Sequence, residues 1–207
     1  MNSLHCFIIA DKFSSMKKIF LLITFSVAIL FSVAQTLKPA SQDNAFADAL
    51  NKIAADFRNN FVNIQGEKLP AETDADTYKS KVCLPDAVGC SITRYHSVED
   101  NSASWQAATY AGDSYNDAVK MYKKTFGLVK KTKLKGADAT GNSFEGELEK
   151  DDQNVRFTVS SLRLKTNDKQ YKNLVAEVEL ISNYNGWEVH LNIYTKKADA
   201  SQENDMQ

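Results

Sequence analysis

The sequence is poor in the residues that mark unusual classes of protein. It holds 3 prolines and 8 glycines in 207 residues, which excludes collagen-like and low-complexity chains. Its 25 Lys and Arg residues are balanced by 26 Asp and Glu residues, so the basic excess of a non-specific nucleic-acid binder is missing. We therefore expect no nucleic-acid partner. The remaining composition, 43% hydrophobic and 25% charged, is typical of an ordinary globular protein.

One long uncharged run stands near the N-terminus, from Ile19 to Ala34, directly after Lys17 and Lys18. A basic start, an apolar middle and an end in small residues predict a secretory signal peptide over residues 1–34. The run is shorter than the roughly 20 apolar residues of a membrane-spanning helix. We therefore expect no integral membrane segment after cleavage.

The leader predicts export, with cleavage between Ala34 and Gln35 and a mature chain that is periplasmic or secreted. Met16 stands immediately before the basic residues, so we interpret it as the true start and residues 1–15 as a spurious extension. The residue directly after the cleavage position is Gln35 and not a cysteine, so the signal of a bacterial lipoprotein is missing.

The mature chain retains two cysteines, Cys83 and Cys90. Two cysteines in an exported chain predict one disulfide. Pro85-Asp86 and Gly89 supply the turn residues that bring the two ends together. A redox-active pair usually has the spacing C-x-x-C, so the longer spacing here favours a structural bridge.

Two segments have helical periodicity. In the first, apolar residues recur at helical spacing from Phe46 to Phe61, which predicts a helix that ends near Asn60 and is capped by Asp43 or Asn44. The second begins at Ser114, where Asp117 completes a pattern like a capping box. Its apolar stripe consists of Tyr115, Ala118, Val119, Tyr122, Phe126 and Val129.

The rest of the mature chain has the pattern of strands. We expect strands within residues 61–69, 78–84, 91–97, 104–111, 143–149, 155–164, 172–182 and 187–195. Within 155–164 the apolar alternation changes phase, which predicts a β-bulge at Ser160-Ser161.

The last two strands are joined by Asn185-Gly186, the strongest sequence signal for a two-residue hairpin turn. This turn opposes Tyr184 to Trp187 and places the apolar residues of both strands on one face. The other face then carries Glu177, Glu179, Glu188, His190 and Asn192.

The order of helix, about four strands, helix and four strands predicts an α+β fold in which helices pack on an antiparallel β-sheet. One arrangement is two tandem α-β-β-β-β units, residues 35–112 with the disulfide loop and residues 113–196. The sequence leaves open whether these units share one sheet. The polar tail, 197–207, is expected to be disordered.

The sequence offers little support for catalysis. His96, Glu99 and Asp100 lack the ligand spacing of a metal site, so we interpret them as a solvated turn and predict neither metal nor cofactor. His190 lies near Glu179 in the predicted hairpin, where it could act as a general base but more commonly forms a surface cross-strand contact. Nucleophile-elbow, phosphate-loop and dinucleotide motifs are all missing.

The second predicted helix and the residues after it are rich in lysine, which allows two interpretations. The lysines could contact an anionic surface, or they could form the solvated face of an amphipathic helix, and the balanced charge of the chain favours the second interpretation. They are Lys120, Lys123, Lys124, Lys130, Lys131, Lys133 and Lys135.

The hypothesis that fits these observations is a non-enzymatic binding module for a protein or a cell-envelope component. Its expected binding residues are Tyr194, His190 and Ile181, which share the outer face of the predicted sheet. One alternative is a small hydrolase with an unrecognised site. Another is an envelope-assembly factor that contacts anionic surfaces. The sequence does not indicate the oligomeric state.

Overall fold

The computed structural model describes residues 42–70, 75–95, 102–135 and 142–196. They all belong to one compact unit, Ser41–Gln207. The predicted leader, the residues around His96 and the C-terminal tail lie outside the described residues, so those predictions stay predictions. In the described part of the chain, no helix is long and apolar enough to span a membrane.

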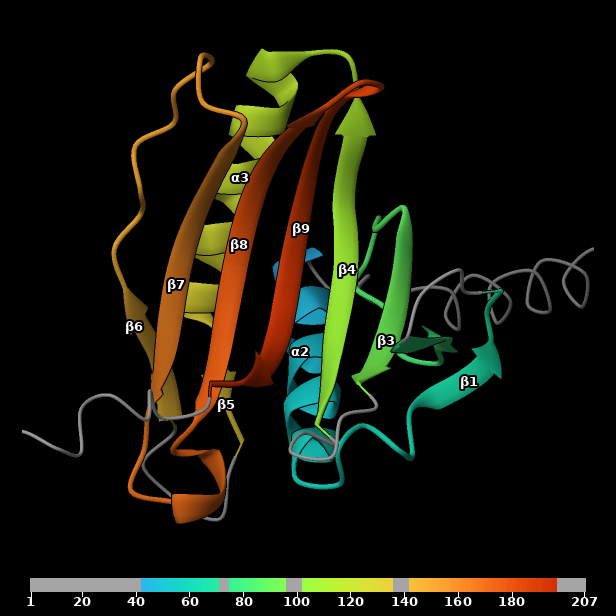
Figure 1. The fold of residues 1–207 in the computed structure, drawn as a ribbon. Coiled ribbons are helices and arrows are strands. Elements are labelled where there is room, and N and C mark those ends of the chain that lie inside the picture. The colour runs from blue at the N-terminus through green and yellow to red at the C-terminus, as the bar shows by residue number, and fades with distance from the viewer. Residues whose placement is uncertain (1–41, 71–74, 96–101, 136–141, 197–207) are drawn as a thin grey trace, which may run out of the picture. The chain divides into compact units, whose positions relative to one another are not determined.

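The described residues form two α-helices and nine strands, in the order helix, four strands, helix and five strands (Figure 1). The elements are α2 (Gln42–Phe57), β1 (Gln65–Lys68), β2 (Ala75–Ser80), β3 (Gly89–Tyr95), β4 (Ala103–Gly112), α3 (Tyr115–Lys131), β5 (Lys133–Leu134), β6 (Asn142–Gly146), β7 (Phe157–Lys165), the 3-10 turn η1 (Lys169–Tyr171), β8 (Leu174–Asn183) and β9 (Gly186–Thr195). The sequence pattern did not predict β5, which is only two residues long.

The strands form one antiparallel sheet in the order β1-β2-β3-β4-β9-β8-β7-β6-β5. The predicted α+β class with antiparallel sheet is therefore confirmed. The strand before α3 and the last strand of the chain meet at the middle of this sheet, where Trp105 pairs with Ile193. A register shift between Ala108 and Tyr110, which the sequence did not predict, interrupts this pairing.

Both helices pack against the same face of the sheet, where they lie behind the strands in Figure 1. The strands direct fully buried side chains toward them, among them Trp105, Val178 and Leu191. Removal of this apolar surface from water is the main stabilising contribution. Trp105 also carries a polar group, and its Nε1 donates a hydrogen bond of 2.9 Å to Ser80 Oγ.

The predicted apolar stripe of α2 is confirmed, whereas the predicted ends of the helix are wrong. Phe46, Leu50, Ile53 and Ala54 are buried against the core. The expected caps, Asp43 and Asn44, lie inside the first turn of α2 rather than before it. The helix also stops at Phe57, ahead of the expected end at Asn60.

The early stop of α2 has a local cause. Asn60 and Phe61 adopt positive φ angles of 53° and 59°, which end the helical path. The buried carboxylate of Asp56 accepts hydrogen bonds from the backbone amides of Asn63 and Ile64 at 2.9 and 3.0 Å. This carboxylate satisfies amides in the turn that leads to β1.

The predicted start of α3 is confirmed. Ser114 is the N-cap, and its side chain accepts a hydrogen bond from the backbone amide of Asp117. The helix ends at Lys131, and Lys130 and Lys131 lie in its last turn, where the helix dipole favours cations. The predicted stripe faces the core, with Tyr122 fully buried at its centre.

The predicted disulfide is also confirmed, because Cys83 and Cys90 are bonded to each other. The strand expected over residues 78–84 is displaced toward the N-terminus, since β2 runs from Ala75 to Ser80 and the cysteine loop follows it. The cysteine loop packs against the core through the buried side chain of Leu84. The backbone amide of Val88 also donates to the carbonyl of Ala108 at 2.7 Å.

The bulge predicted at Ser160-Ser161 is wrong. The pairing of β7 with β8 runs without a register shift. Ser160 is fully buried and its Oγ lies 2.5 Å from the hydroxyl of Tyr122. The change of phase instead reflects Phe157 and Val159, two apolar residues on the strand face that the helices do not cover.

The predicted hairpin between β8 and β9 is present, but its register differs from the prediction. Asn183 pairs with Gly186, so Tyr184 and Asn185 form the turn and Trp187 does not oppose Tyr184. The side chain of Tyr184 is 98% exposed rather than buried. The shift changes the cross-strand partners but not the faces. The other residues of the predicted apolar face remain on the helix side, and they are Val178, Leu180, Trp187, Leu191 and Ile193.

The geometry at Gly186 explains this register. Its φ is +118°, a region that side chains disfavour, and a Cβ there would lie 2.6 Å from the carbonyl oxygen of Gly112. The side chain of Asn183 meanwhile accepts a hydrogen bond of 2.8 Å from the amide of Asn185. The glycine is therefore required directly after the turn and not inside it.

Candidate functional site

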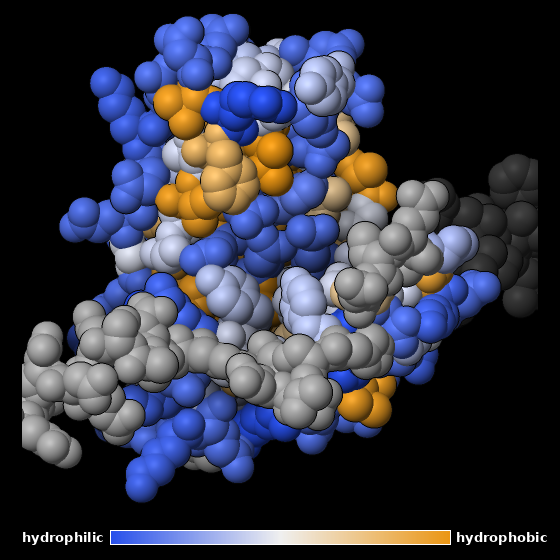
Figure 2. All heavy atoms as spheres, in the orientation of Figure 1, coloured by the Kyte–Doolittle hydropathy of each residue, from blue (hydrophilic) through white to orange (hydrophobic). Residues whose placement is uncertain are grey.

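The face of the sheet opposite the helices carries the candidate site. Neither α2 nor α3 lies on that side, and no other described element covers it (Figure 1, Figure 2). We call the outward side chains of β3, β4, β9, β8 and β7 the open face. Alternation along the strands assigns its members, because neighbouring residues of a strand point to opposite faces.

A hollow of about 490 Å³ opens on this face. We call it the polar hollow, because most of its walls are carboxylate, amide and hydroxyl groups from β3, β4, β9 and β8. Six of its lining residues supply the carboxylate, amide and tyrosine groups described below. They are Tyr95, Gln106, Glu177, Glu179, Asn192 and Tyr194.

On one side of the polar hollow, Glu177 accepts hydrogen bonds from two hydroxyl groups. Ser161 Oγ donates to Glu177 Oε1 at 2.7 Å, and the hydroxyl of Tyr194 is the second donor. Burial, followed by the neighbouring Glu177, raises the pKa of Tyr194 to about 12. Tyr194 is therefore a neutral hydrogen-bond donor at any physiological pH.

On the other side, Glu179 belongs to a chain of amide groups. Gln106 Nε2 donates to Asn192 Oδ1 at 2.9 Å, and the Asn192 side chain bonds Glu179. Burial raises the pKa of Glu179, an effect that the Asn192 hydrogen bond and His190 oppose. Both carboxylates of the polar hollow are thus held in place by neutral donors.

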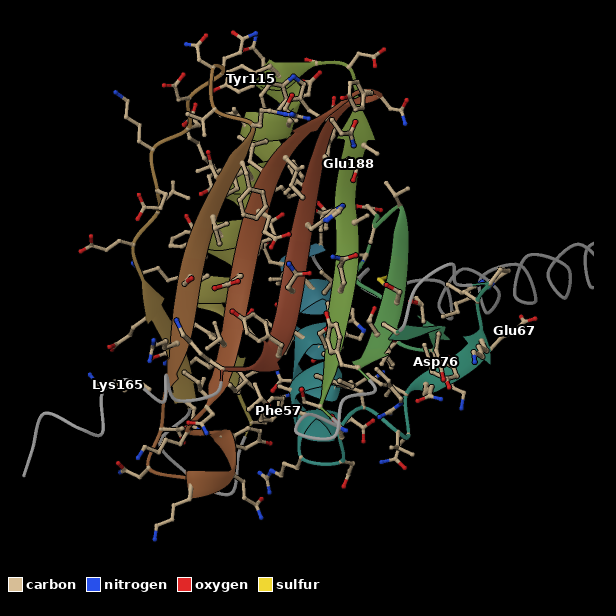
Figure 3. All side chains as sticks on the ribbon, in the orientation of Figure 1. Phe57, Glu67, Asp76, Tyr115, Lys165 and Glu188 are labelled. Carbon is tan, nitrogen blue, oxygen red and sulfur yellow. A yellow bond between two sulfur atoms is a disulfide. The ribbon has the colours of Figure 1, made fainter. Side chains whose placement is uncertain are left out.

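His190 lies beside the polar hollow rather than in its wall. Its Nε2 is 2.9 Å from Glu188 Oε2, and its Nδ1 is 3.9 Å from Glu179 Oε2. Glu188 also accepts a hydrogen bond of 2.7 Å from Asn183 Nδ2. Figure 3 labels Glu188, near the turn end of β9. Among the described residues, no group of His, Cys, Asp and Glu side chains is arranged to hold a metal ion.

An apolar area occupies the part of the open face nearer the β8–β9 turn. Phe157 is 52% exposed and pairs with Ile181 of β8, while Val159 lies on the same side of β7. We call Val155, Phe157, Val159 and Ile181 the apolar end. Figure 2 shows hydrophobic side chains over this part of β7 and β8. Clustered exposed apolar side chains are typical of interaction sites.

The three binding residues expected from the sequence all lie on the open face, but they do not form one cluster. Tyr194 lines the polar hollow, Ile181 belongs to the apolar end, and His190 lies between them. The sequence reasoning missed Tyr95 and Gln106. Gln106 lies on β4, which pairs with β9, and Tyr95 lies on β3, which pairs with β4. The pairing of β4 with β9 joins residues distant in sequence, and no local signal predicts it.

Several lysines of α3 bond with groups of the protein itself. Lys123 Nζ lies 2.7 Å from Asp151 Oδ1, Lys124 Nζ donates to Gln42 Oε1 at 3.2 Å, and Lys130 Nζ donates to the carbonyl of Gly146 at 2.9 Å. These contacts favour the interpretation of a solvated helix face.

Comparison with known proteins finds no matching family model, no matching curated protein and no matching solved structure. The geometry of the open face is therefore the basis for inferring the function.

Proposed function

We propose that this protein is an exported binding module that recognises a protein or a cell-envelope component through its open face. One observation carries the proposal: a polar hollow and an apolar end lie on the same face of the sheet, which no described helix covers. Interfaces commonly combine a desolvated apolar area with a few fixed polar groups.

Export and domain organisation are part of this proposal. The predicted leader supports export, and so does the disulfide, because such bonds persist mainly in oxidising compartments. We further propose that residues 35–112 and 113–196 are two tandem α/β units joined by the β4–β9 pairing. The polar hollow takes walls from both units, since Gln106 belongs to the first and Glu177 to the second.

The hydrolase alternative has weaker support. A carboxyl group with a raised pKa, Glu179, lines the polar hollow, as an acid catalyst would. His190, however, is outside that wall, and its closer partner is Glu188 rather than Glu179. Nucleophilic hydrolysis also needs a hydroxyl group in contact with a base, whereas the contacts of His190 are the carboxylates of Glu188 and Glu179.

Photo-crosslinking in the cells that produce the protein tests the proposal. A photoreactive amino acid replaces Phe157 on the open face or, in the matched control, Lys120 on the exposed side of α3. We expect one defined adduct from position 157 and none from position 120. Adducts from position 120 alone would support the envelope-assembly alternative instead. The absence of an adduct from both positions would contradict a macromolecular partner.

A further inference from the structure

The charged side chains among the described walls of the polar hollow are all acidic. Glu177 and Glu179 both line it, whereas no Lys, Arg or His is among its described lining residues. Two cationic residues act on the hollow from outside its described wall. Arg163 acts on Tyr194 electrostatically, and His190 is 3.9 Å from Glu179 while its other nitrogen contacts Glu188.

The internal partners of the two carboxylates hold them but do not neutralise them. Ser161 and Tyr194 donate to Glu177, and Asn192 bonds Glu179. All three are uncharged groups. An ionised carboxylate offers about four acceptor sites, so hydrogen bonding to a ligand is compatible with these contacts.

Two aromatic rings contribute to the same walls. Tyr95, 47% exposed, comes from β3 and Tyr194 comes from β9. The face of a tyrosine ring attracts a cation through its quadrupole. Carboxylates combined with aromatic faces are therefore suited to a positively charged group that also carries apolar carbon atoms.

We propose that the polar hollow binds a cationic side chain, the guanidinium of an arginine or the ammonium of a lysine, presented by a partner protein. The proposal rests on the proposed function and names the chemistry of the partner. The cation contacts Glu177 and Glu179, and its aliphatic stem lies against Tyr95 and Tyr194. The volume of about 490 Å³ is well above the size of one such group and admits the neighbouring backbone.

A neutral saccharide is the competing ligand, since sugars also bind to tyrosine, amide and carboxylate groups. The uncompensated charge decides between them. A neutral ligand that displaces water leaves two carboxylates desolvated without a counter-charge, which is unfavourable. A cation supplies that counter-charge and forms charge-assisted hydrogen bonds, which are the stronger kind.

The test is an NMR titration of the ¹⁵N-labelled protein with N-acetyl-arginine methylamide. Its neutral control is N-acetyl-citrulline methylamide, which has nearly the same shape without the charge. We expect saturable shifts of the backbone amides of Glu177, Glu179, Asn192 and Tyr194 with the arginine probe. The citrulline probe should bind at least about tenfold more weakly, a difference of about 1.4 kcal/mol.

Two variants locate the binding. Glu179→Gln keeps the shape of the side chain and should weaken arginine binding at least about tenfold, whereas Lys120→Gln, on the exposed side of α3, should leave it unchanged. A dispersed spectrum for each variant shows that it folds.

Three results would overturn the proposal. The first is equal binding of both probes. The second is no saturable shift up to about 50 mM, where a dissociation constant of 1 mM would give saturation. The third is saturation of the same amides by an N-acetylglucosamine oligomer while the arginine probe has no effect, which would assign the polar hollow to a neutral saccharide.

The two proposals fail in different ways. A crosslinked partner at position 157 together with no arginine binding would remove the cation site and leave the binding module intact. Arginine binding together with no crosslinked partner at any open-face position would leave a cation site and remove the macromolecular partner.

Discussion

The two faces of the sheet are built from the same strands, yet they differ in almost every physical respect. On β8, Val178 and Leu180 face the helices and are buried, while Glu177 and Glu179 alternate with them and face outward. The inner face forms the core that stabilises the fold. The outer face does not pack against the helices, so a hollow and an apolar area on it call for a functional explanation.

Polar groups also differ between the faces. On the helix side, Tyr122 and Ser160 bond each other, and no buried side-chain nitrogen or oxygen among the described residues lacks a partner. On the open face, carboxylates are held by neutral donors while their charge is left without a matching cation in the polar hollow. Polar groups of this protein can therefore have all their hydrogen bonds satisfied without their charge being balanced by a neighbouring cation.

The largest expected difference between the faces concerns stability. Trp105→Ala removes a fully buried side chain and should lower the free energy of unfolding by about 4 kcal/mol. Phe157→Ala removes an aromatic ring from the open face and should lower it by less than about 1 kcal/mol. Urea denaturation measures both. Equal losses would mean that the open face is part of the core.

The β8–β9 turn sets the register of both faces, because a slip of one residue would exchange them. Gly186→Ala forces a strained φ and a clash with the carbonyl of Gly112, and should cost about 2 kcal/mol. Gly127→Ala is the matched control. Gly127 lies inside α3 with open space around a Cβ, so this change should stabilise by about 0.5–1 kcal/mol. A neutral effect at Gly186 would contradict the register.

A smaller difference separates two tyrosine hydroxyl groups. Tyr122→Phe removes a buried hydrogen bond to Ser160 and should lower the free energy of unfolding by about 1 kcal/mol. Tyr194→Phe acts on the open face and should change it by no more than about 0.5 kcal/mol. Chemical denaturation again provides the measurement, and a larger effect at Tyr194 would reverse the assignment of the two faces.

The smallest expected effect is a shift in titration. Tyr194 should titrate near pH 12, which NMR of ¹³C-labelled tyrosine can follow, with Tyr194→Phe to assign the signal. Glu177→Gln should lower the pKa of Tyr194, because the Glu177 carboxylate accepts a hydrogen bond from the neutral phenol and repels the phenolate. Glu188→Gln should leave it unchanged. An unaltered pKa in Glu177→Gln would mean that the two groups are not in contact.

The same titration has a consequence for stability. The pKa of Tyr194 is higher in the folded chain than the value of about 10 in an unfolded one. Its contribution to stability is therefore complete below about pH 10 and is lost as the pH rises through about 12. Tyr194→Phe should remove this part of the alkaline loss of stability.

The parts of the fold that the sequence predicts are those with local causes. Ser114 and Asp117 define the start of α3 through a contact within one turn. The alternation in β8 and β9 identifies the two faces, and the spacing of Cys83 and Cys90 indicates the disulfide. These signals depend on neighbouring residues alone.

The parts that the sequence does not predict depend on distant contacts. The turn at Gly186 takes its register from a close approach to Gly112, far away along the chain. The alternation of apolar residues in β7 changes phase at Ser160, which suggested a bulge. Ser160 in fact faces the core, where it bonds Tyr122 of α3, and a contact between such distant residues cannot be seen in the local pattern. The polar hollow needs the pairing of β4 with β9, so only its Tyr194 side was visible in the sequence.

The proposed role of the open face is to bind a partner. The most direct test is native mass spectrometry of the protein purified gently from the cells that produce it, as wild type, as Phe157→Glu and as Lys120→Glu. The account predicts a stoichiometric additional mass on the wild type and on Lys120→Glu, and its loss from Phe157→Glu. A bare chain mass for the wild type, or an additional mass that persists in Phe157→Glu, would contradict it.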